Sequence, residues 1–257
     1  MNVQQALTTY KAVFLDAGDT LVTVPEAQET VQKYLAEKQF TAQPKQIEAF
    51  FREAFDRFYY QKELDAEAVC SPESDRTYWI GIYDYVLAQL GAQDKLQEDE
   101  IHRCCHELYD LFVSPSQYVL FPDVKPALAQ LQQRGYKIGL ISNFAPTLRA
   151  ILEEKGILSY FDPVLVSTEV GIEKPNPRIF QMALEQSGLQ SSDVLYIGDH
   201  EINDIWSPNQ VGIDAVKIIR YPYQTEQGDG TKKGEHIHSL LDLFEPGGKL
   251  FDHEYEA

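Results

Sequence analysis

The chain has 257 residues, 44% of them hydrophobic, and its 40 acidic and 22 basic residues give a formal net charge of −18. The apolar content predicts a folded protein, and the negative charge excludes broad binding to the phosphates of DNA or RNA. No apolar run approaches the roughly 18 residues of a membrane span, no signal-peptide pattern is seen, and three cysteines are too few for a disulfide framework. We therefore expect a cytoplasmic protein without nucleic-acid or membrane partners, and the sequence predicts no oligomeric state.

The first predicted strand runs into the stretch VFLDAGDTL, residues 13–21, and ends at Asp16. Residues 23–118 then carry helical patterns and no convincing strand. The strand pattern returns after this segment. We expect residues 1–22 and 119–257 to form one domain and residues 23–118 to form an all-α insertion.

Strands and helices alternate in the second half of the chain. The predicted strands are Tyr136–Ser142, Pro163–Ser167, Asp193–Asp199 and Asp214–Ile219. The predicted helices are Pro122–Gly135, Pro146–Gly156 and Asn176–Gly188. This alternation predicts a Rossmann-like α/β core, with a parallel sheet covered on both faces. Residues 223–236 predict a polar loop, and the residues after Pro246 a frayed end.

Polar residues follow four of the predicted strands, and in a parallel sheet those strand ends meet at one edge. The residues are Asp16, Ser142, Asn143, Glu169, Lys174, Asp199 and Asp204. Crowded carboxylates favour a hard cation such as magnesium, while a lysine and a serine suit phosphoryl oxygens. An aspartate can attack phosphorus. The residues by themselves predict metal-assisted phosphoryl transfer.

Four stretches resemble, in order, the four motifs of the haloacid dehalogenase-like hydrolase superfamily. They are DAGDT (16–20), GLISN (139–143), GIEKPNPRIF (171–180) and GDHEIND (198–204). The helical insertion stands where this superfamily places a helical cap. The resemblance implies a hydrolase with a Rossmann-like core and an inserted all-α cap.

The resemblance implies a nucleophile and a metal site. Asp16 is the expected nucleophile and a magnesium ligand, with the backbone carbonyl of Gly18 and the carboxylate of Asp199 as further ligands. Asp204 is expected to support the metal through water or to hold Lys174.

The resemblance also implies contacts to the transferring group. Ser142 and Lys174 are expected to bind it and to be catalytic. Thr20 is expected to close the first turn by a hydrogen bond to its backbone, at the substrate-binding edge. Asn143 either lines the substrate site or serves the turn, and we expect Glu169 to be a surface or capping carboxylate rather than a ligand.

Gly18 departs from the phosphatase pattern, in which an aspartate at this position protonates the leaving oxygen and then activates water. Losing such an acid/base costs roughly 10² to 10⁴ in rate, and the side chain of Asp19 should point elsewhere. Three alternatives stay open: a proton donor such as His200, Glu201 or a cap residue, a substrate with a good leaving group, or a weakly active protein that mainly binds. A positive φ at residue 18 is a separate reason for glycine.

A glycine-bearing first motif resembles the rhythmically expressed gene 2-like branch, whose substrate is unassigned. Carbon–halogen cleavage is a competing reaction, but such dehalogenases need no metal and lack the acidic pair Asp199 and Asp204. We expect a magnesium-dependent phosphohydrolase that acts on a small phosphorylated metabolite through an aspartyl-phosphate. The alternatives are a catalytically weak ligand-binding or regulatory protein and a dehalogenase-type hydrolase.

The sequence HRCCH places His102 and His106 four residues apart on a predicted cap helix. Two such histidines can share a metal. No further ligand set stands near them in the sequence, so we expect ordinary helix packing.

Overall fold

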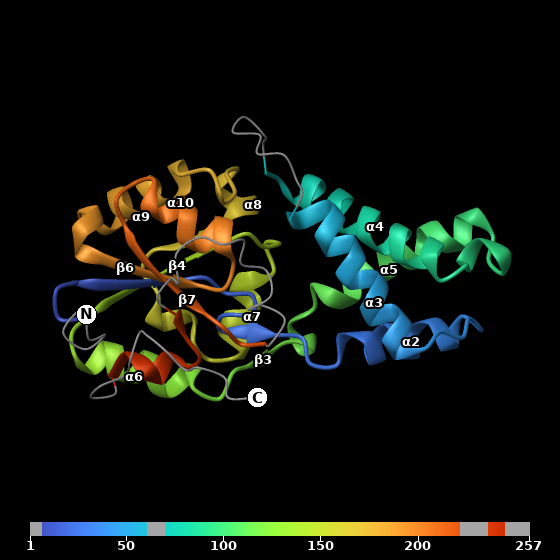
Figure 1. Ribbon diagram of the computed structural model, residues 1–257, viewed down its shortest axis with the longest axis horizontal. Helices are drawn as coiled ribbons and strands as arrows, with labels where there is room; N and C mark the ends of the chain where they lie inside the picture. Colours follow the sequence, from blue (N-terminus) through green and yellow to red (C-terminus); the bar gives the residue numbers. More distant parts are fainter. Residues whose placement is uncertain (1–6, 61–69, 222–235, 245–257) are drawn as a thin grey trace, which may run out of the picture. The chain divides into compact units, whose positions relative to one another are not determined.

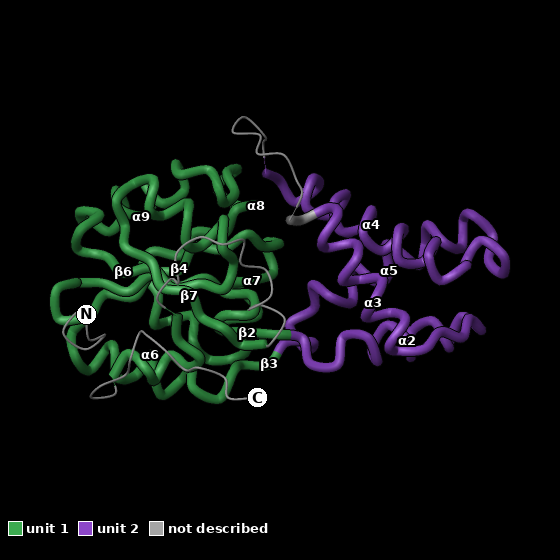
Figure 2. Tube along the Cα trace, in the orientation of Figure 1, with its two compact units in different colours: residues 1–23, 119–257 green, residues 24–118 purple. Residues whose placement is uncertain are grey.

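The computed structural model of the protein describes residues 7–60, 70–221 and 236–244 (Figure 1). The chain divides into two compact units (Figure 2). Unit 1 comprises Met1–Thr23 and Val119–Ala257, and unit 2 comprises Val24–Tyr118. The predicted end after Pro246 and the predicted loop up to residue 235 lie outside the described residues.

Unit 1 is built on a six-stranded parallel sheet with the strand order β5-β4-β1-β6-β7-β8. The strands are β1 (Ala12–Leu15), β4 (Lys137–Ser142), β5 (Val164–Val166), β6 (Val194–Gly198), β7 (Asp214–Ile218) and β8 (His236–Ile237). Every residue of the central strands β1 and β6 is buried, as expected for strands covered on both faces. The predicted parallel α/β core is confirmed.

Helices lie on both faces of this sheet, with α9 and α10 on one side and α6 on the other (Figure 1). The helices of unit 1 are α6 (Val124–Gln133), α7 (Leu148–Glu154), α8 (Ser167–Val170), α9 (Arg178–Ser187) and α10 (Ser207–Asn209). Helix α9 ends where Gly188 adopts φ 68°, a conformation that glycine adopts without steric cost. The third predicted strand is shorter than expected because Ser167 already begins α8.

A two-stranded antiparallel ribbon was not predicted. Strands β2 (Val22–Thr23) and β3 (Val119–Leu120) pair with Val22 opposite Leu120. Two residues are too few to show an alternating pattern in a sequence, and the partners are almost 100 positions apart. The ribbon lies where the chain leaves unit 1 and where it returns.

Unit 2 consists of helices within its described residues, as predicted. They are α2 (Ala27–Glu37), α3 (Pro44–Phe55), α4 (Pro72–Gln89) and α5 (Glu98–Phe112), with a π-helical turn, η1 (Asp56–Tyr60), after α3. Ser71 begins α4 by accepting a hydrogen bond from the backbone N–H of Ser74 at 3.1 Å, and Pro72 occupies the first helical position. The four helices enclose a core of their own, which includes Leu35, Ile47, Leu87 and Leu108.

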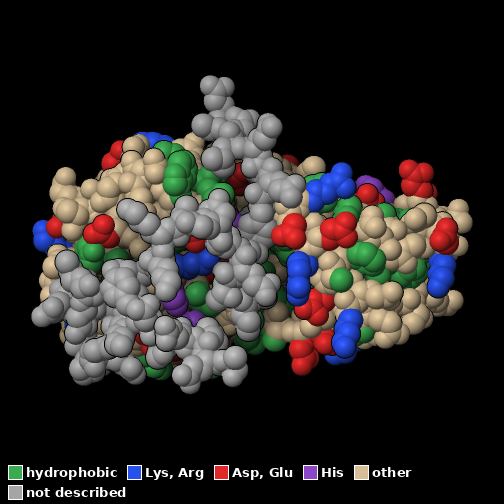
Figure 3. Space-filling view, viewed as in Figure 1, with side chains coloured by type: hydrophobic (Ala, Val, Ile, Leu, Met, Phe, Trp, Pro, Cys, Tyr) green, Lys and Arg blue, Asp and Glu red, His purple; other side chains and the backbone are tan. Residues whose placement is uncertain are grey.

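No helix in the described ranges is long and apolar enough to cross a membrane. The three cysteines are buried, and none of them forms a disulfide in the described part of the chain. On the visible face of unit 2, acidic side chains are interspersed with lysine and arginine, and no continuous basic patch is seen there (Figure 3).

Candidate active site

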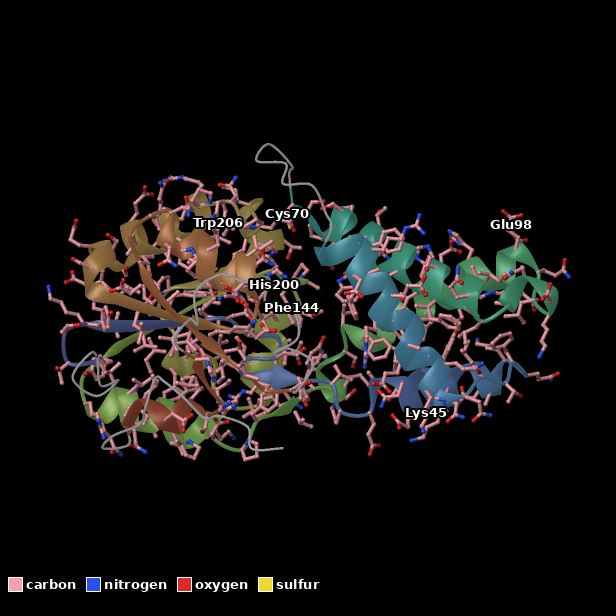
Figure 4. All side chains as sticks on the ribbon, viewed as in Figure 1. Lys45, Cys70, Glu98, Phe144, His200 and Trp206 are labelled. Carbon is pink, nitrogen blue, oxygen red and sulfur yellow. The ribbon has the colours of Figure 1, made fainter. Side chains whose placement is uncertain are left out.

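The carboxyl ends of three adjacent strands bring the predicted site residues together. Strands β4, β1 and β6 are neighbours; Ser142 is the last residue of β4, Asp16 follows β1 and Asp199 follows β6. Figure 4 shows Phe144 and His200, from the segments after β4 and β6, at the same end of the sheet. The hydroxyl of Ser142 forms no hydrogen bond within the described part of the chain and so is available to a ligand.

Lys174 is the centre of the hydrogen-bond network in this site. Its Nζ lies 2.7 Å from Asp16 Oδ1, 2.6 Å from Asp204 Oδ1 and 3.1 Å from the hydroxyl of Tyr196. An ammonium group has three N–H donors, so all three are used inside the protein. Burial lowers the pKa of Lys174, but the attraction of Asp16 and Asp204 outweighs it and raises the pKa above its ordinary value.

Asn143 fixes the backbone of Lys174. Its Nδ2 donates to the carbonyl oxygen of Lys174 at 2.7 Å, and its Oδ1 accepts from the N–H of Lys174 at 2.7 Å. The amide therefore holds the lysine in place. Contact between Asn143 and a substrate stays a prediction.

Asp204 reaches Lys174 because residue 198 is a glycine. A Cβ at Gly198 would overlap the carboxyl group of Asp204. The carboxylate is further held by the N–H of His200, which donates to Asp204 Oδ2 at 3.0 Å. The π-helix η6 (Glu201–Trp206) carries Asp204 back over the end of β6.

Three carboxylates gather at this point. One oxygen each from Asp16, Asp199 and Asp204 can be chosen so that all lie within 4.8 Å of one another. Burial raises the pKa of Asp16 to about 6, although Lys174 opposes the shift. Burial and the charges of Asp204 and Asp16 raise the pKa of Asp199 well above its ordinary value. One ammonium does not offset three carboxylates, and a hard cation suits this arrangement of oxygens.

The turn after Asp16 differs from one expectation. Gly18 does not adopt a positive φ; the left-handed residue is Asp19, with φ 47°. A Cβ at Gly18 would meet nothing within 4 Å. Backbone strain therefore does not explain this glycine, and the position has room for a side chain.

Thr20 also differs from its expected role. Its side chain is fully buried, and its hydroxyl has no hydrogen-bond partner within the described residues. Backbone bonds close the turn instead: the N–H groups of Leu21 and Val22 donate to the carbonyl of Ala17 at 2.8 and 3.0 Å. The prediction that the Thr20 hydroxyl closes this turn by a hydrogen bond to the backbone was therefore wrong.

The carboxylate of Asp19 contacts the neighbouring ribbon, and its charge also acts on Asp199. Asp19 Oδ1 accepts a hydrogen bond from Thr23 Oγ1 at 2.9 Å, and this hydroxyl is 2.8 Å from the hydroxyl of Tyr221. Burial raises the pKa of Asp19, opposed by the Thr23 bond and by Arg220. The sequence analysis missed three residues of this region, Thr23, Tyr221 and Tyr196. Each forms its hydrogen bonds with a residue far along the chain or with a residue in a turn, and no local pattern indicates such a bond.

The two named candidates for a replacement proton donor are poorly suited to that role. Nδ1 of His200 accepts hydrogen bonds from the N–H groups of Ile202 at 3.2 Å and Asn203 at 3.1 Å. Burial lowers the pKa of His200 to about 4, so the imidazole is neutral near pH 7. Glu201 forms an ion pair with Lys217 at 3.3 Å.

The remaining sequence candidates have structural contacts. Glu169 pairs with Arg149 at 2.8 Å, as expected for a surface carboxylate. The rings of His102 and His106 are tilted by 49° with their centroids 4.5 Å apart, but Nδ1 of His106 accepts a hydrogen bond from Arg76 at 3.2 Å. The one cluster of three metal-ligating side chains within the described ranges is that of Asp16, Asp199 and Asp204.

Comparison with known proteins agrees with this geometry. A family model for haloacid dehalogenase-like hydrolases matches residues 10–212. Haloacid dehalogenase-like hydrolase domain-containing protein 3 of Danio rerio is 30% identical over 235 residues, which are 90% of this chain and 93% of that protein.

Two further similarities are to a phosphatase over part of the chain and to a solved structure by its fold. The glyceraldehyde 3-phosphate phosphatase of Methanopyrus kandleri is 34% identical over 145 residues, 55% of this chain and 60% of that protein. A HAD hydrolase of Bacillus subtilis, solved with bound magnesium, shares the fold at a TM-score of 0.66 and 17% identity, over 91% of this chain and 97% of that one. The family match and the full-length relative show that the chain belongs to the haloacid dehalogenase-like hydrolases.

Proposed function

We propose that this hydrolase is a magnesium-dependent phosphatase that acts on a small phosphorylated metabolite. The observation that carries the proposal is the cluster of carboxylates at Asp16, Asp199 and Asp204, in which the pKa values of Asp16 and Asp199 are raised. The names of a phosphatase relative and of a magnesium-bound structural neighbour support the same class.

The donor set fits magnesium because it consists of hard oxygen atoms. Asp16, Asp199 and the backbone carbonyl of Gly18 would hold the ion, and Asp204 would support it. When bound, the ion would neutralise the crowded carboxylates and polarise the phosphoryl oxygens.

Asp16 is the proposed nucleophile. One carboxylate oxygen forms a bond to phosphorus while the bond from phosphorus to the leaving oxygen breaks, which gives an aspartyl-phosphate. Water then attacks this phosphate, releases inorganic phosphate and restores the carboxylate. Lys174 holds Asp16 through its Oδ1, and the free hydroxyl of Ser142 donates to a phosphoryl oxygen.

Lys174 makes its contribution mainly through the carboxylates. Because its three donors already bind Asp16, Asp204 and Tyr196, contact with a phosphoryl oxygen requires one of these bonds to be exchanged. Its positive charge still lowers the cost of bringing an anion beside Asp16.

An Asp16→Asn variant tests the nucleophile. It keeps the size and the hydrogen bond to Lys174 but loses the anion, so kcat on an activated ester such as p-nitrophenyl phosphate should fall by several orders of magnitude. The exposed carboxylate Asp214 supplies a control, since Asp214→Asn should keep wild-type turnover. Wild-type kcat in the Asp16 variant would place the chemistry elsewhere.

A catalytically weak ligand-binding protein is the second candidate. It is favoured by the absence of an acid at Gly18, the neutral His200 and the occupied donors of Lys174. Turnover of sugar phosphates, nucleotides and acyl phosphates, measured with and without magnesium, separates the two. Phosphate binding by calorimetry without turnover of any ester would support the second candidate.

A further inference from the structure

The segment after β7 binds the loop that carries Asp16. Arg220 donates from Nη2 to the carbonyl oxygen of Thr20 at 2.7 Å and from Nε to the same oxygen at 3.2 Å. The hydroxyl of the next residue, Tyr221, lies 2.8 Å from Thr23 Oγ1. Two consecutive residues thus contact both halves of the loop, 200 positions away in the sequence.

Arg220 is itself held rigidly. Its Nη1 pairs with Asp123 Oδ2 at 2.9 Å, and its side chain is only 5% exposed. The guanidinium lies over the ring of Phe121, 4.3 Å from the centroid. Asp123 in turn accepts from the N–H of Leu240 at 2.6 Å and from Ser239 Oγ at 2.9 Å. A buried, stacked and paired arginine presents its donors in one orientation.

The second contact continues to Asp19. The Thr23 hydroxyl has one proton and donates it to Asp19 Oδ1, so Tyr221 is the donor in its bond with Thr23. The chain Tyr221–Thr23–Asp19 holds the carboxylate of a residue whose φ is 47°. The left-handed conformation is unfavourable for a residue other than glycine, and it persists where neighbouring groups hold it.

Backbone contacts also hold the end of the loop: Val22 pairs with Leu120 in the β2–β3 ribbon, and the N–H of Phe121 donates to the carbonyl of Leu21 at 3.1 Å. Within the described residues, Arg220 is the side chain from outside the loop that binds the backbone of residues 17–22. The loop contains Gly18, which has no side chain to pack. The position of Gly18 depends on the turn that is closed by the bonds to the carbonyl of Ala17. Movement of this turn would displace the carbonyl of Gly18 and, through it, Asp16.

We propose that Arg220 and Tyr221 are positioning residues that fix the Asp16–Thr23 loop for metal binding and attack. Arg220 acts through the carbonyl of Thr20, and Tyr221 acts through Thr23 and Asp19. This role rests on the proposed magnesium-dependent function. We assign neither residue as a ligand of the metal or of the substrate.

The first test is Arg220→Met, which keeps the apolar stem over Phe121 and removes the donors. Loss of a group that orients a metal ligand typically weakens metal binding or activity about 10- to 100-fold. We expect the magnesium Kd, measured by calorimetry, to rise by that factor. In hydrogen exchange without metal, the amides of Leu21 and Val22 should exchange faster while those of β6 keep their protection.

Loss of the ion pair needs a separate control, because Arg220→Met leaves Asp123 as an unpaired buried carboxylate. Asp123→Asn breaks the same ion pair but keeps both bonds to Thr20. The double variant Arg220→Met with Asp123→Asn removes the leftover charge. We expect the double variant to regain stability but not magnesium affinity, and Asp123→Asn alone to keep most of its affinity.

Two further variants separate the geometry from the charge. Arg220→Lys keeps a cation near Asp123 but does not reproduce the two-donor contact with Thr20, so it should restore stability more than magnesium affinity. Arg178→Met removes an exposed arginine that pairs with Glu185 and should change neither quantity. Tyr221→Phe removes the hydrogen bond to Thr23 and should lower kcat more than it changes KM.

The outcomes also separate this inference from the proposed function. Wild-type protein that binds no magnesium would refute the function, and the exchange rates of Leu21 and Val22 would still decide whether Arg220 orders the loop. If those rates and the magnesium Kd of Arg220→Met match those of Arg178→Met, Arg220 does not position the loop. Uniformly faster exchange across unit 1 would also overturn the inference, because it would show a general structural role.

Discussion

Gly18 lies in a turn that has space for a side chain and no positive φ at that residue. The neighbouring Asp19 takes the left-handed conformation and turns its carboxylate to Thr23. The glycine is therefore a difference in chemistry rather than a requirement of the backbone. His200, with its pKa lowered to about 4, does not replace the missing acid near pH 7.

Gly18→Asp should fold and should change how rate depends on the leaving group. In the wild type an alkoxide must leave unprotonated, so rates should fall steeply as the pKa of the leaving alcohol rises. The new carboxyl group should flatten that dependence and raise turnover of alkyl phosphates by about 10²-fold or more. The check is a series of aryl and alkyl phosphates; an unchanged slope in a folded Gly18→Asp protein would mean that another group already supplies the proton.

Asp199 should reduce the stability of the metal-free protein. Its pKa, like that of Asp16, is raised on folding. A carboxyl group with a higher pKa in the folded state stabilises the folded protein at pH values below its unfolded pKa, which is 3.8 for an aspartate. This stabilisation is lost as the pH rises through the folded pKa, which is about 6 for Asp16. Metal-free protein should therefore be less stable at pH 7.5 than at pH 5.

Asp199→Asn removes one of these charges. At pH 7.5 without metal it should raise the melting temperature by about 2 to 4 °C, which corresponds to about 1 kcal/mol at this chain length, and it should abolish the rise that magnesium causes in the wild type. Glu153→Gln, on the exposed side of α7, is the matched charge control. A lower melting temperature for metal-free Asp199→Asn would contradict the repulsion described here.

At the scale of elements, the junction of β6 with η6 positions the acidic pair. Strand β6 ends at Gly198, and η6 brings Asp204 back against that glycine. The same strand contributes Tyr196, whose hydroxyl is within 3.2 Å of both Lys174 Nζ and Asp204 Oδ1. One strand end thus determines the surroundings of Lys174.

Gly198→Ala should disturb this junction. The added methyl group overlaps Asp204 near its Cβ, where the side chain has little freedom, so the variant should lose about 1 to 3 kcal/mol of stability. The kcat of the folded variant should also fall, because the methyl group displaces Asp204 from Lys174, and this fall is separate from the loss of folded protein. Gly81→Ala in α4, where a Cβ meets nothing within 4 Å, is the control and should be neutral or slightly stabilising. Wild-type kcat in Gly198→Ala would show that Asp204 is dispensable.

At the scale of the molecule, each unit has a core of its own. Unit 1 buries the residues around Phe14, Ile141 and Tyr196, and unit 2 those around Leu35, Tyr83 and Leu108. The proposed metal ligands all belong to unit 1. Assignment of unit 2 as a substrate cap stays a proposal.

Heat should therefore unfold the two units in separable steps, and magnesium should shift only one of them. A ligand that binds the folded state of unit 1 stabilises that unit by mass action. Differential scanning calorimetry in EDTA and in magnesium measures both steps, with Asp199→Asn as the variant that should not respond. Equal shifts of both transitions, or a single transition that moves as a whole, would show that the units unfold together.

The sequence by itself determined the parallel core, the helical insertion and the superfamily. Its strands and helices are long enough for their periodicity to be read, and four local motifs follow strand ends. Parallel topology then requires those ends to share an edge, so the meeting of Asp16, Ser142, Lys174 and Asp199 was predictable although 183 positions (199 − 16) separate the first from the last.

Only the tertiary structure decided how these groups are restrained. These restraints depend on distances between segments that are far apart in the chain. They are the three partners of Lys174, the two bonds from Asn143 to the backbone of Lys174, the direction of Asp19 and the contact of Arg220 with Thr20. No periodicity records such contacts, because each is a single side-chain pairing fixed by packing. The short strands β2, β3 and β8 were missed for the same reason: two residues form a strand only when a partner strand lies beside them.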